Sequence, residues 1–468
     1  MAATISESKK DLFENVPVRK ALMSLAVPAI ISQLINLVYN TVDTMFIGQT
    51  GDAYKTAAVT LIYALFSMTK SFSNLFGIGG GSLIARLSGS GRPEKARAVC
   101  SFSFYAAIAS AAVYSLLVLI FLDPLLRLLG ASENTMVFAR QYTLIVVVLG
   151  NVPVILSSVT AYLLQNAGYS KQAGFGLSGG GILNIVLDPL FMFVLLPKGM
   201  EVIGAALATL VANCIACAYL VIMLRKAVKT APLSLSPRDL RAIGKEEIRE
   251  VFSVGIPSAI LTGLFEIAHI VLNHLMSVHG DLQLAAIGIV SKLGRLPTAV
   301  NVGLCHGMMP LVSYNFASGN HRRMNDTLRI TTVFGLAVAF GAIALFEIFT
   351  TPISRMFMNT SAGDAALAAA TVGYTARFLR IAALASPFQF INFSTSYSMQ
   401  AVGYGKGAFI HSLVRQLGFY IPFLYLLDVL FGADGLAGAL IAGELCGGLF
   451  ALWLFARWKR SHVTSQAA

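Results

Sequence analysis

The chain has 468 residues, of which 56% are hydrophobic and only 12% charged, and its mean hydropathy is +0.74. This balance excludes an ordinary soluble protein and indicates an integral membrane protein. The net charge of +12 is spread over many short connections and does not form a patch with stacking aromatics, so it does not indicate binding to nucleic acid.

Apolar runs long enough to cross a membrane as helices follow one another along the chain, and we count twelve. In chain order we expect spanning helices near residues 20–48, 57–85, 98–122, 138–163, 172–196, 202–224, 250–278, 284–314, 328–352, 371–400, 407–430 and 435–456. The length of these runs favours helices over the short alternating strands of an outer-membrane barrel. The polar first twenty residues lack the pattern of a cleavable signal peptide, so we expect the first spanning helix to direct insertion.

The chain contains an internal repeat. Residues 28–51 align with residues 257–280 without a gap, and residues 162–171 match residues 397–406. The repeat predicts an all-α membrane protein whose twelve transmembrane helices form two six-helix lobes, related by a pseudo-twofold axis, around a central cleft. We expect a terminal segment 1–19, a first lobe 20–226, a linker 227–247, a second lobe 248–457 and a tail 458–468.

Basic residues follow every even-numbered predicted span, whereas the opposite connections are short and balanced in charge. The basic residues include Arg86 and Arg92 after the second span, Lys171 after the fourth and Arg322 after the eighth. By the positive-inside rule we expect both termini in the cytoplasm and a multi-pass protein of the cell membrane.

Two carboxylates fall inside predicted spans of the first lobe, at Asp43 and Asp188. A carboxylate in a span costs at least ~2.5 kcal/mol on insertion scales, so each suggests a function. Asn184 lies four residues before Asp188, on the same helix face. Such oxygens could bind Na⁺, or one carboxylate could hold a proton. A structural salt bridge or a capped helix break is the alternative.

The second lobe does not repeat this acid pair. Asp43 aligns with Leu272, and Asp188 aligns with about Phe423. Glu266 and Glu444 are instead acids particular to the second lobe. Glu266 could face the cleft and attract a cationic substrate, or pair with an internal base.

Basic residues inside the spans include Lys70, Lys292, Arg295 and Arg415. Internal ion pairs, such as Lys292 with Glu266, are one explanation. If Lys70 and Arg295 face the cleft unpaired, the substrate would be anionic or zwitterionic.

The run Gly79-Gly80-Gly81 lacks the surrounding pattern of a phosphate-binding loop, so we expect close helix packing there. The histidines have no metal-ligand spacing, and the cysteines lie in or beside apolar helices. We therefore expect no cofactor, and transport that draws on an ion gradient.

Together, the twelve spans, the repeat, Pro28 with the run from Tyr39 to Thr44, the pair Gln165 and Gln400, and the run from Asn184 to Pro189 resemble the multidrug and toxic compound extrusion (MATE) family. The resemblance covers essentially residues 15–457. It implies a coupling-ion cluster at Asp43, Asn184 and Asp188, with Thr209 as a further member. Glu266 matches an acid of many relatives. An acid in the tenth helix of some relatives is absent, and Gln389 and Asn392 occupy that region.

We expect a monomeric secondary transporter that exports amphiphilic small molecules, chiefly organic cations, across the lipid bilayer in exchange for H⁺ or Na⁺. Its substrate cleft would include Tyr39, Asn40, Lys70, Glu266, Lys292, Arg295, Gln389 and Asn392. Alternatives are a lipid-linked oligosaccharide flippase and an exporter of an anionic or zwitterionic metabolite. A membrane-embedded enzyme is disfavoured because no nucleophile-base or metal cluster is visible in a span. A channel is disfavoured by the paired deep carboxylates and the two-lobe repeat.

Overall fold

The computed structural model describes residues 10–50, 52–356 and 365–462, and these residues form helices and connections without a strand. The first lobe consists of α2 (Val18–Gly48), α3 (Ala53–Gly89), α4 (Pro93–Ile120), α5 (Leu122–Leu128), α6 (Glu133–Tyr142), α7 (Asn151–Asn166), α8 (Ser170–Leu190) and α9 (Glu201–Ala227). The second lobe consists of α10 (Lys245–Val278), α11 (Asp281–Ala317), α12 (His321–Met356), α13 (Ala365–Ala383), α14 (Ser386–Ala401), α15 (Gly405–Leu413) and α16 (Ile421–His462). A short 3₁₀ helix, η3 (Pro237–Ala242), lies in the linker.

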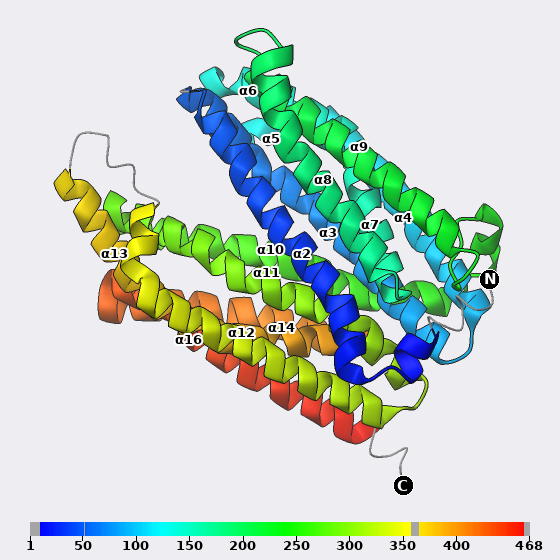
Figure 1. Ribbon diagram of the computed structural model, residues 1–468. Coiled ribbons are helices and arrows are strands. Elements are labelled where there is room, and N and C mark those ends of the chain that lie inside the picture. Colours follow the sequence, from blue (N-terminus) through cyan, green and yellow to red (C-terminus); the bar gives the residue numbers. More distant parts are fainter. Residues whose placement is uncertain (1–9, 51, 357–364, 463–468) are drawn as a thin grey trace.

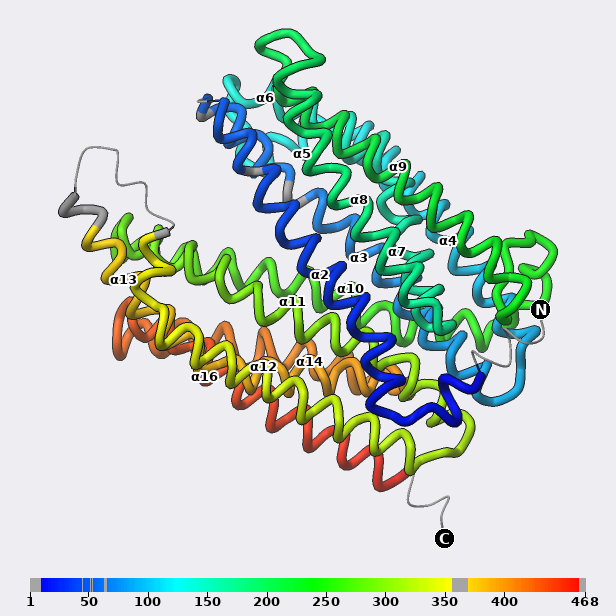
Figure 2. The backbone as a smooth tube through the Cα atoms, viewed as in Figure 1, coloured from blue at the N-terminus to red at the C-terminus, as the bar shows by residue number. Residues whose placement is uncertain are grey.

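The two lobes form a V (Figures 1 and 2). They meet where α3 packs against α10 and α2 packs against α11. The start of α2, the end of α16 and the linker lie at the closed end of the V, and the lobes diverge toward the other end. The closed end is therefore also the end that carries most of the basic connections.

Glycines allow the lobes to approach closely at these crossings. A Cβ added to Gly79 would lie 2.3 Å from the Val251 carbonyl oxygen, and one added to Gly255 would lie 2.0 Å from the Leu75 carbonyl oxygen. A Cβ on Gly307 would lie 2.4 Å from the Ala26 Cα. The glycine run that includes Gly79 thus serves helix packing, as the sequence predicted, because small residues let membrane helices approach.

All twelve predicted spans fall on helices. Among the described residues, seven helices are long and apolar enough to cross a membrane, or eight if the bent pair 133–149 and 151–166 is one span. The last of these, 405–462, contains two predicted spans, divided at Gly432, whose φ of 60° is in the left-handed region. The predicted twelve-helix, two-lobe architecture agrees with this arrangement.

Several predicted spans are not straight α-helices. The fourth passes through π-helical turns, η1 (Thr143–Leu149), before a 45° bend. Similar turns follow α8 as η2 (Phe191–Leu195) and α15 as η4 (Val414–Tyr420). Single π-helical stretches are common near functional sites. η2 begins three residues after Asp188, and η4 includes Arg415. In each lobe a π-helical stretch therefore lies at or beside a buried charged residue.

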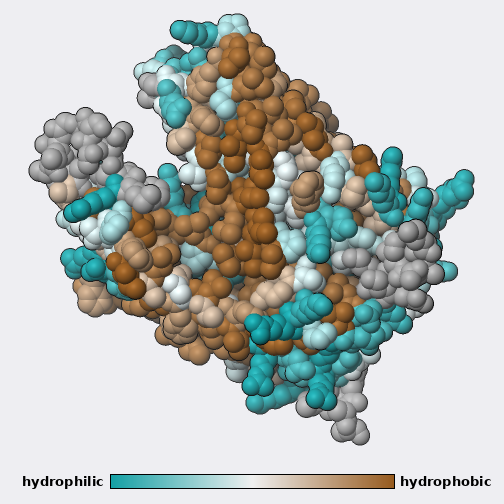
Figure 3. Space-filling model, viewed as in Figure 1, coloured by the Kyte–Doolittle hydropathy of each residue, from teal (hydrophilic) through white to brown (hydrophobic). Residues whose placement is uncertain are grey.

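The surface agrees with insertion in a membrane. Hydrophobic residues cover the middle of the visible face, and hydrophilic residues gather toward its ends (Figure 3). Exposed large apolar side chains occur on both lobes, including Val186, Ile270, Val333 and Val429. Such an extensive exposed apolar surface is expected where lipid surrounds the protein.

Candidate functional site

The first-lobe acids and their amide partner form one polar cluster. Asp188 is fully buried on α8, and Asn184 Nδ2 donates to its Oδ1 at 3.1 Å. Asn184 Nδ2 also lies 3.3 Å from Thr209 Oγ1 on α9. Asp43, on α2, is close enough to Asp188 for the two carboxylates to repel each other. Three helices therefore bring together the four residues expected to bind the coupling ion.

The cluster contains acceptor oxygens without donors. Among the described residues, no hydrogen-bond partner reaches buried Asp43 Oδ1, Asn184 Oδ1 or Asp188 Oδ2. Buried polar atoms are normally hydrogen-bonded, and buried charges are normally paired. Carboxylate and amide oxygens are ligands for a hard cation, and a carboxylate can instead take a proton. The residues present thus fit either H⁺ or Na⁺ as a transported ion.

Sequence reasoning missed one neighbour of this cluster. Tyr142, buried at the end of α6, is close enough to Asp43 and Asp188 to interact electrostatically with both. Nothing in the sequence distinguishes this tyrosine from the other aromatic residues in the spans. Its position depends on the bend after η1, which the apolar sequence of the fourth span does not reveal.

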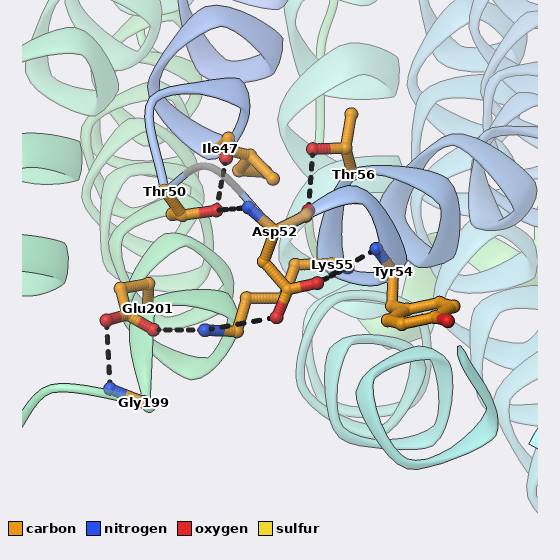
Figure 4. Close-up of polar contacts among 8 residues, drawn as sticks. All are labelled: Ile47, Thr50, Asp52, Tyr54, Lys55, Thr56, Gly199 and Glu201. Carbon is orange, nitrogen blue, oxygen red and sulfur yellow. Dashed lines mark hydrogen bonds and ion pairs between the residues drawn. The ribbon is translucent and has the colours of Figure 1, made fainter. Parts of the chain in front are cut away.

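Charged residues anchor the open end of the first lobe near the cluster (Figure 4). Lys55 Nζ lies 2.8 Å from Glu201 Oε2 and 3.7 Å from Asp52 Oδ2. Asp52 also caps α3 by accepting from the Tyr54 N–H at 2.9 Å. Glu201 accepts from the Gly199 N–H at 2.8 Å. These contacts join the α2–α3 connection to the start of α9, and so fix the helices that carry Asp43 and Thr209.

A cavity of about 480 Å³ lies between the lobes. Its wall contains aromatic side chains from both lobes, including Phe66, Tyr162 and Phe265. Tyr162 of the first lobe stacks on His306 of the second with ring centroids 5.1 Å apart. Asn184 also lines the cavity, so one residue belongs both to the wall and to the acid cluster. Pockets of this size and composition accommodate drug-sized ligands.

The structure places five of the eight predicted cleft residues in this wall, namely Tyr39, Lys70, Glu266, Arg295 and Gln389. The other three do not line it. Asn40 donates to the Asn36 carbonyl oxygen at 2.6 Å, and Lys292 is exposed away from the cavity. Asn392 is fully buried within the second lobe. The ion pair between Lys292 and Glu266 is also absent from the described residues.

Asn392 belongs to a second polar cluster, in the second lobe. Arg415 donates from Nε and Nη2 to the Glu444 carboxylate at 3.0 and 2.6 Å. Asn392 Nδ2 donates to Glu444 Oε2 at 2.8 Å, and His411 Nε2 lies 2.9 Å from Asn392 Oδ1. The Arg415 guanidinium is 4.8 Å from the ring centroid of Phe393. The sequence gives no sign of this pairing, because Arg415 and Glu444 are 29 residues apart.

Comparison with known proteins identifies the family. The family model described as MatE matches residues 28–190 and 254–426, one segment in each lobe. The chain belongs to the MATE family. The multidrug export protein MepA of Staphylococcus saprophyticus is 30% identical over 440 residues, which are 94% of each chain. MepA of Staphylococcus aureus strain MRSA252 is 30% identical over 435 residues, 93% of each chain.

Solved structures show the same fold. A crystal structure of a MATE protein in complex with MaL6 superposes with a TM-score of 0.89 and 21% identity over 97% of this chain and 99% of the other. A MOP superfamily transporter from Pyrococcus furiosus, described as having a binding pocket of reversed polarity, gives a TM-score of 0.87 and 22% identity over 98% of each chain. Membership of the MATE family confirms the prediction of a multi-pass membrane transporter and not an enzyme.

Proposed function

We propose that this MATE protein exports amphiphilic organic compounds in exchange for H⁺ or Na⁺, and that the ion binds at Asp43, Asn184 and Asp188. The observation that carries the proposal is the set of three buried acceptor oxygens without hydrogen-bond donors among the described residues. Two carboxylates that repel each other in an apolar interior favour the uptake of a cation or a proton. Thr209, which contacts Asn184, positions the amide between the two helices.

Asn184 provides the connection between ion and substrate. It contacts Asp188 and Thr209 on one side and lines the cavity on the other. An ion bound by its amide oxygen and the carboxylates would change how α8 faces the cavity. A ligand shifts the equilibrium between two conformations only if it binds one of them more tightly than the other. A tenfold shift needs a difference of about 1.4 kcal/mol between the two binding free energies.

The arrangement of charges supports an orientation of the protein in the membrane. We place the closed end of the V in the cytoplasm, because the basic connections and the first and last described residues lie there. At that end Arg86 Nη1 lies 2.6 Å from Glu250 Oε2, across the two lobes. The cavity would then open toward the outside of the cell membrane, where the coupling ion enters.

The cavity volume supports small molecules as substrates. About 480 Å³ lies within the ~300–1,000 Å³ typical of drug-sized ligands. The two relatives named multidrug export proteins support the same class.

The test is transport by the purified chain in proteoliposomes, with a pH gradient or a Na⁺ gradient imposed separately. A rhodamine with a free carboxyl group is a suitable first probe, because this amphiphilic dye carries both a cationic and an acidic group. We expect one of the two gradients to drive its movement, and Asp43→Asn to reduce the driven component to the background of empty liposomes. The carboxylate cannot be replaced by an amide because the amide carries no charge and cannot hold a proton at neutral pH.

The matched control is Asp123→Asn. Asp123 is half exposed and pairs with Arg140 on the surface, so its loss should leave transport intact. Gradient-driven transport by Asp43→Asn at the rate of the unmodified protein would refute the ion site.

A further inference from the structure

The charged residues of the cavity are not balanced. Lys70 on α3 and Arg295 on α11 bring two positive charges to the wall, and Glu266 on α10 brings one negative charge. Lys70 is close enough to both of the others to interact with them electrostatically. Glu444 also lines the cavity, but Arg415 neutralises it with two hydrogen bonds. His269 and His306 also line the cavity. Without counting their imidazoles, the wall has an excess of positive charge.

These three charged groups, of which Lys70 and Glu266 are half-buried and Arg295 is exposed, differ from the buried and paired Arg415 and Glu444. Within the described ranges, no hydrogen bond or ion pair reaches the charged ends of Lys70, Arg295 or Glu266. Lys70 Nζ lies 5.6 Å from the centroid of the Phe66 ring. Unpaired charges inside a membrane protein are costly and normally face a partner or a substrate path. A ligand is thus the group most suited to pair with them.

We propose that the substrates of this cavity carry an acidic group, a carboxylate or a phosphate, which binds to Lys70 and Arg295. Glu266 pairs with an amine when the substrate also contains one. The inference rests on the proposed transport function and names the substrate class of the same cavity. It departs from the expectation of simple organic cations, for which two bases against one acid are a poor match.

The chemistry of the two bases suits this role. A guanidinium offers a planar pair of donors that matches a carboxylate or a phosphate, and an ammonium adds a compact charge. Aromatic side chains such as Phe66 and Phe265 would hold the apolar part of the ligand. An acidic amphiphile would satisfy both the charge and the apolar wall.

The experiment measures equilibrium binding of two fluorescent probes to the purified full chain in lipid nanodiscs, by fluorescence polarisation. The probes are a rhodamine with a free carboxyl group and its methyl ester, which differ only in the acidic group. We expect the acid to bind about tenfold more tightly than the ester, the size expected for one hydrogen bond between charged groups. Lys70→Gln and Arg295→Gln should each reduce binding of the acid by a similar factor and leave the ester unchanged.

Lys292→Gln is the matched control, because Lys292 lies on the same helix as Arg295, one turn away, and does not line the cavity. It should leave the preference for the acid unchanged. Size-exclusion profiles check that each variant is folded. Lys70→Gln removes a half-buried charge that has no ion pair among the described residues, so folding should not suffer.

Three results would overturn the proposal: equal or tighter binding of the ester, an equal loss of both probes in the Lys70 and Arg295 variants, or no binding of either probe. Because no gradient is used, these results are separate from ion coupling. The Asp43→Asn variant should lose driven transport and still prefer the acid probe.

Discussion

The two lobes contain polar clusters that differ in one respect, the source of the positive charge. In the first lobe Asp43 and Asp188 have no basic partner among the described residues, and acceptor oxygens remain open. In the second lobe Arg415 supplies the cation, and it pairs with Glu444 through two hydrogen bonds. On our proposal the first cluster exchanges its cation, whereas the second has a cation fixed to the chain.

This difference is the reason we propose an ion site in the first lobe alone, although the two lobes are repeats. The Arg415 guanidinium is 1% exposed and lies 4.9 Å from the ring centroid of Phe265, so it cannot leave or be replaced by solvent ions. Asn392 and His411 complete the second cluster by hydrogen bonds. The buried charges of the second lobe are therefore paired with each other, and our proposal confines ion exchange to the first lobe.

The largest effect is expected when the fixed ion pair is broken. Glu444→Gln leaves Arg415 buried without a counter-ion, which should reduce the free energy of unfolding by about 3–5 kcal/mol. Thermal unfolding of the purified protein in detergent measures this loss. The double variant Arg415→Met with Glu444→Leu should recover most of the stability, because it removes both charges.

Glu347→Gln is the control for that series. Glu347 pairs with Arg380, whose side chain is 55% exposed, so its loss should cost less than about 1 kcal/mol. If Glu444→Gln is as stable as the unmodified protein, the second cluster is not a structural ion pair and the contrast between the lobes fails.

An intermediate effect is expected from the amide of the first cluster. Asn184→Ala removes one open oxygen and the hydrogen bond to Asp188, so the apparent affinity for the coupling ion should fall about fivefold, equivalent to one hydrogen bond. The measurement is the dependence of transport on ion concentration. Asn392→Ala, in the second cluster, should lower stability and leave ion affinity unchanged. Equal ion affinity in Asn184→Ala and the unmodified protein would contradict the assignment.

The smallest effect is expected at the open ends of the lobes, where Lys55 pairs with Glu201 in the first lobe and His279 contacts Asp428 in the second. Lys55→Gln in the first lobe and Asp428→Asn in the second break pairs with Glu201 and His279 at 2.8 and 2.6 Å. Each should reduce the free energy of unfolding by about 1 kcal/mol, because these side chains keep 11–28% of their exposure and water replaces part of the lost contact. Thermal unfolding of both variants compares them directly. A loss of stability close to that of Glu444→Gln would show that the burial of the Arg415–Glu444 pair does not explain its larger expected effect.

Much of the candidate site was predictable because the cost of burial marks certain residue types. A carboxylate in an apolar run is expensive wherever it lies, so Asp43 and Asp188 were recognisable, and the spacing of four placed Asn184 beside Asp188. The cleft residues were predicted less well. Lys292 and Arg295 are three residues apart on one helix, yet only Arg295 lines the cavity, because the rotation of α11 against its neighbours separates them.

The sequence by itself determined the twelve apolar spans, the repeat and the acids of the first lobe, since hydrophobic length and the cost of a buried charge are local properties. Only the tertiary structure decided which charges are neutralised. Arg415 and Glu444 come from different helices and meet by packing, and Lys70, Glu266 and Arg295 converge on the cavity without forming pairs. Pairing depends on distances between helices, which the spacing of residues along the chain does not contain.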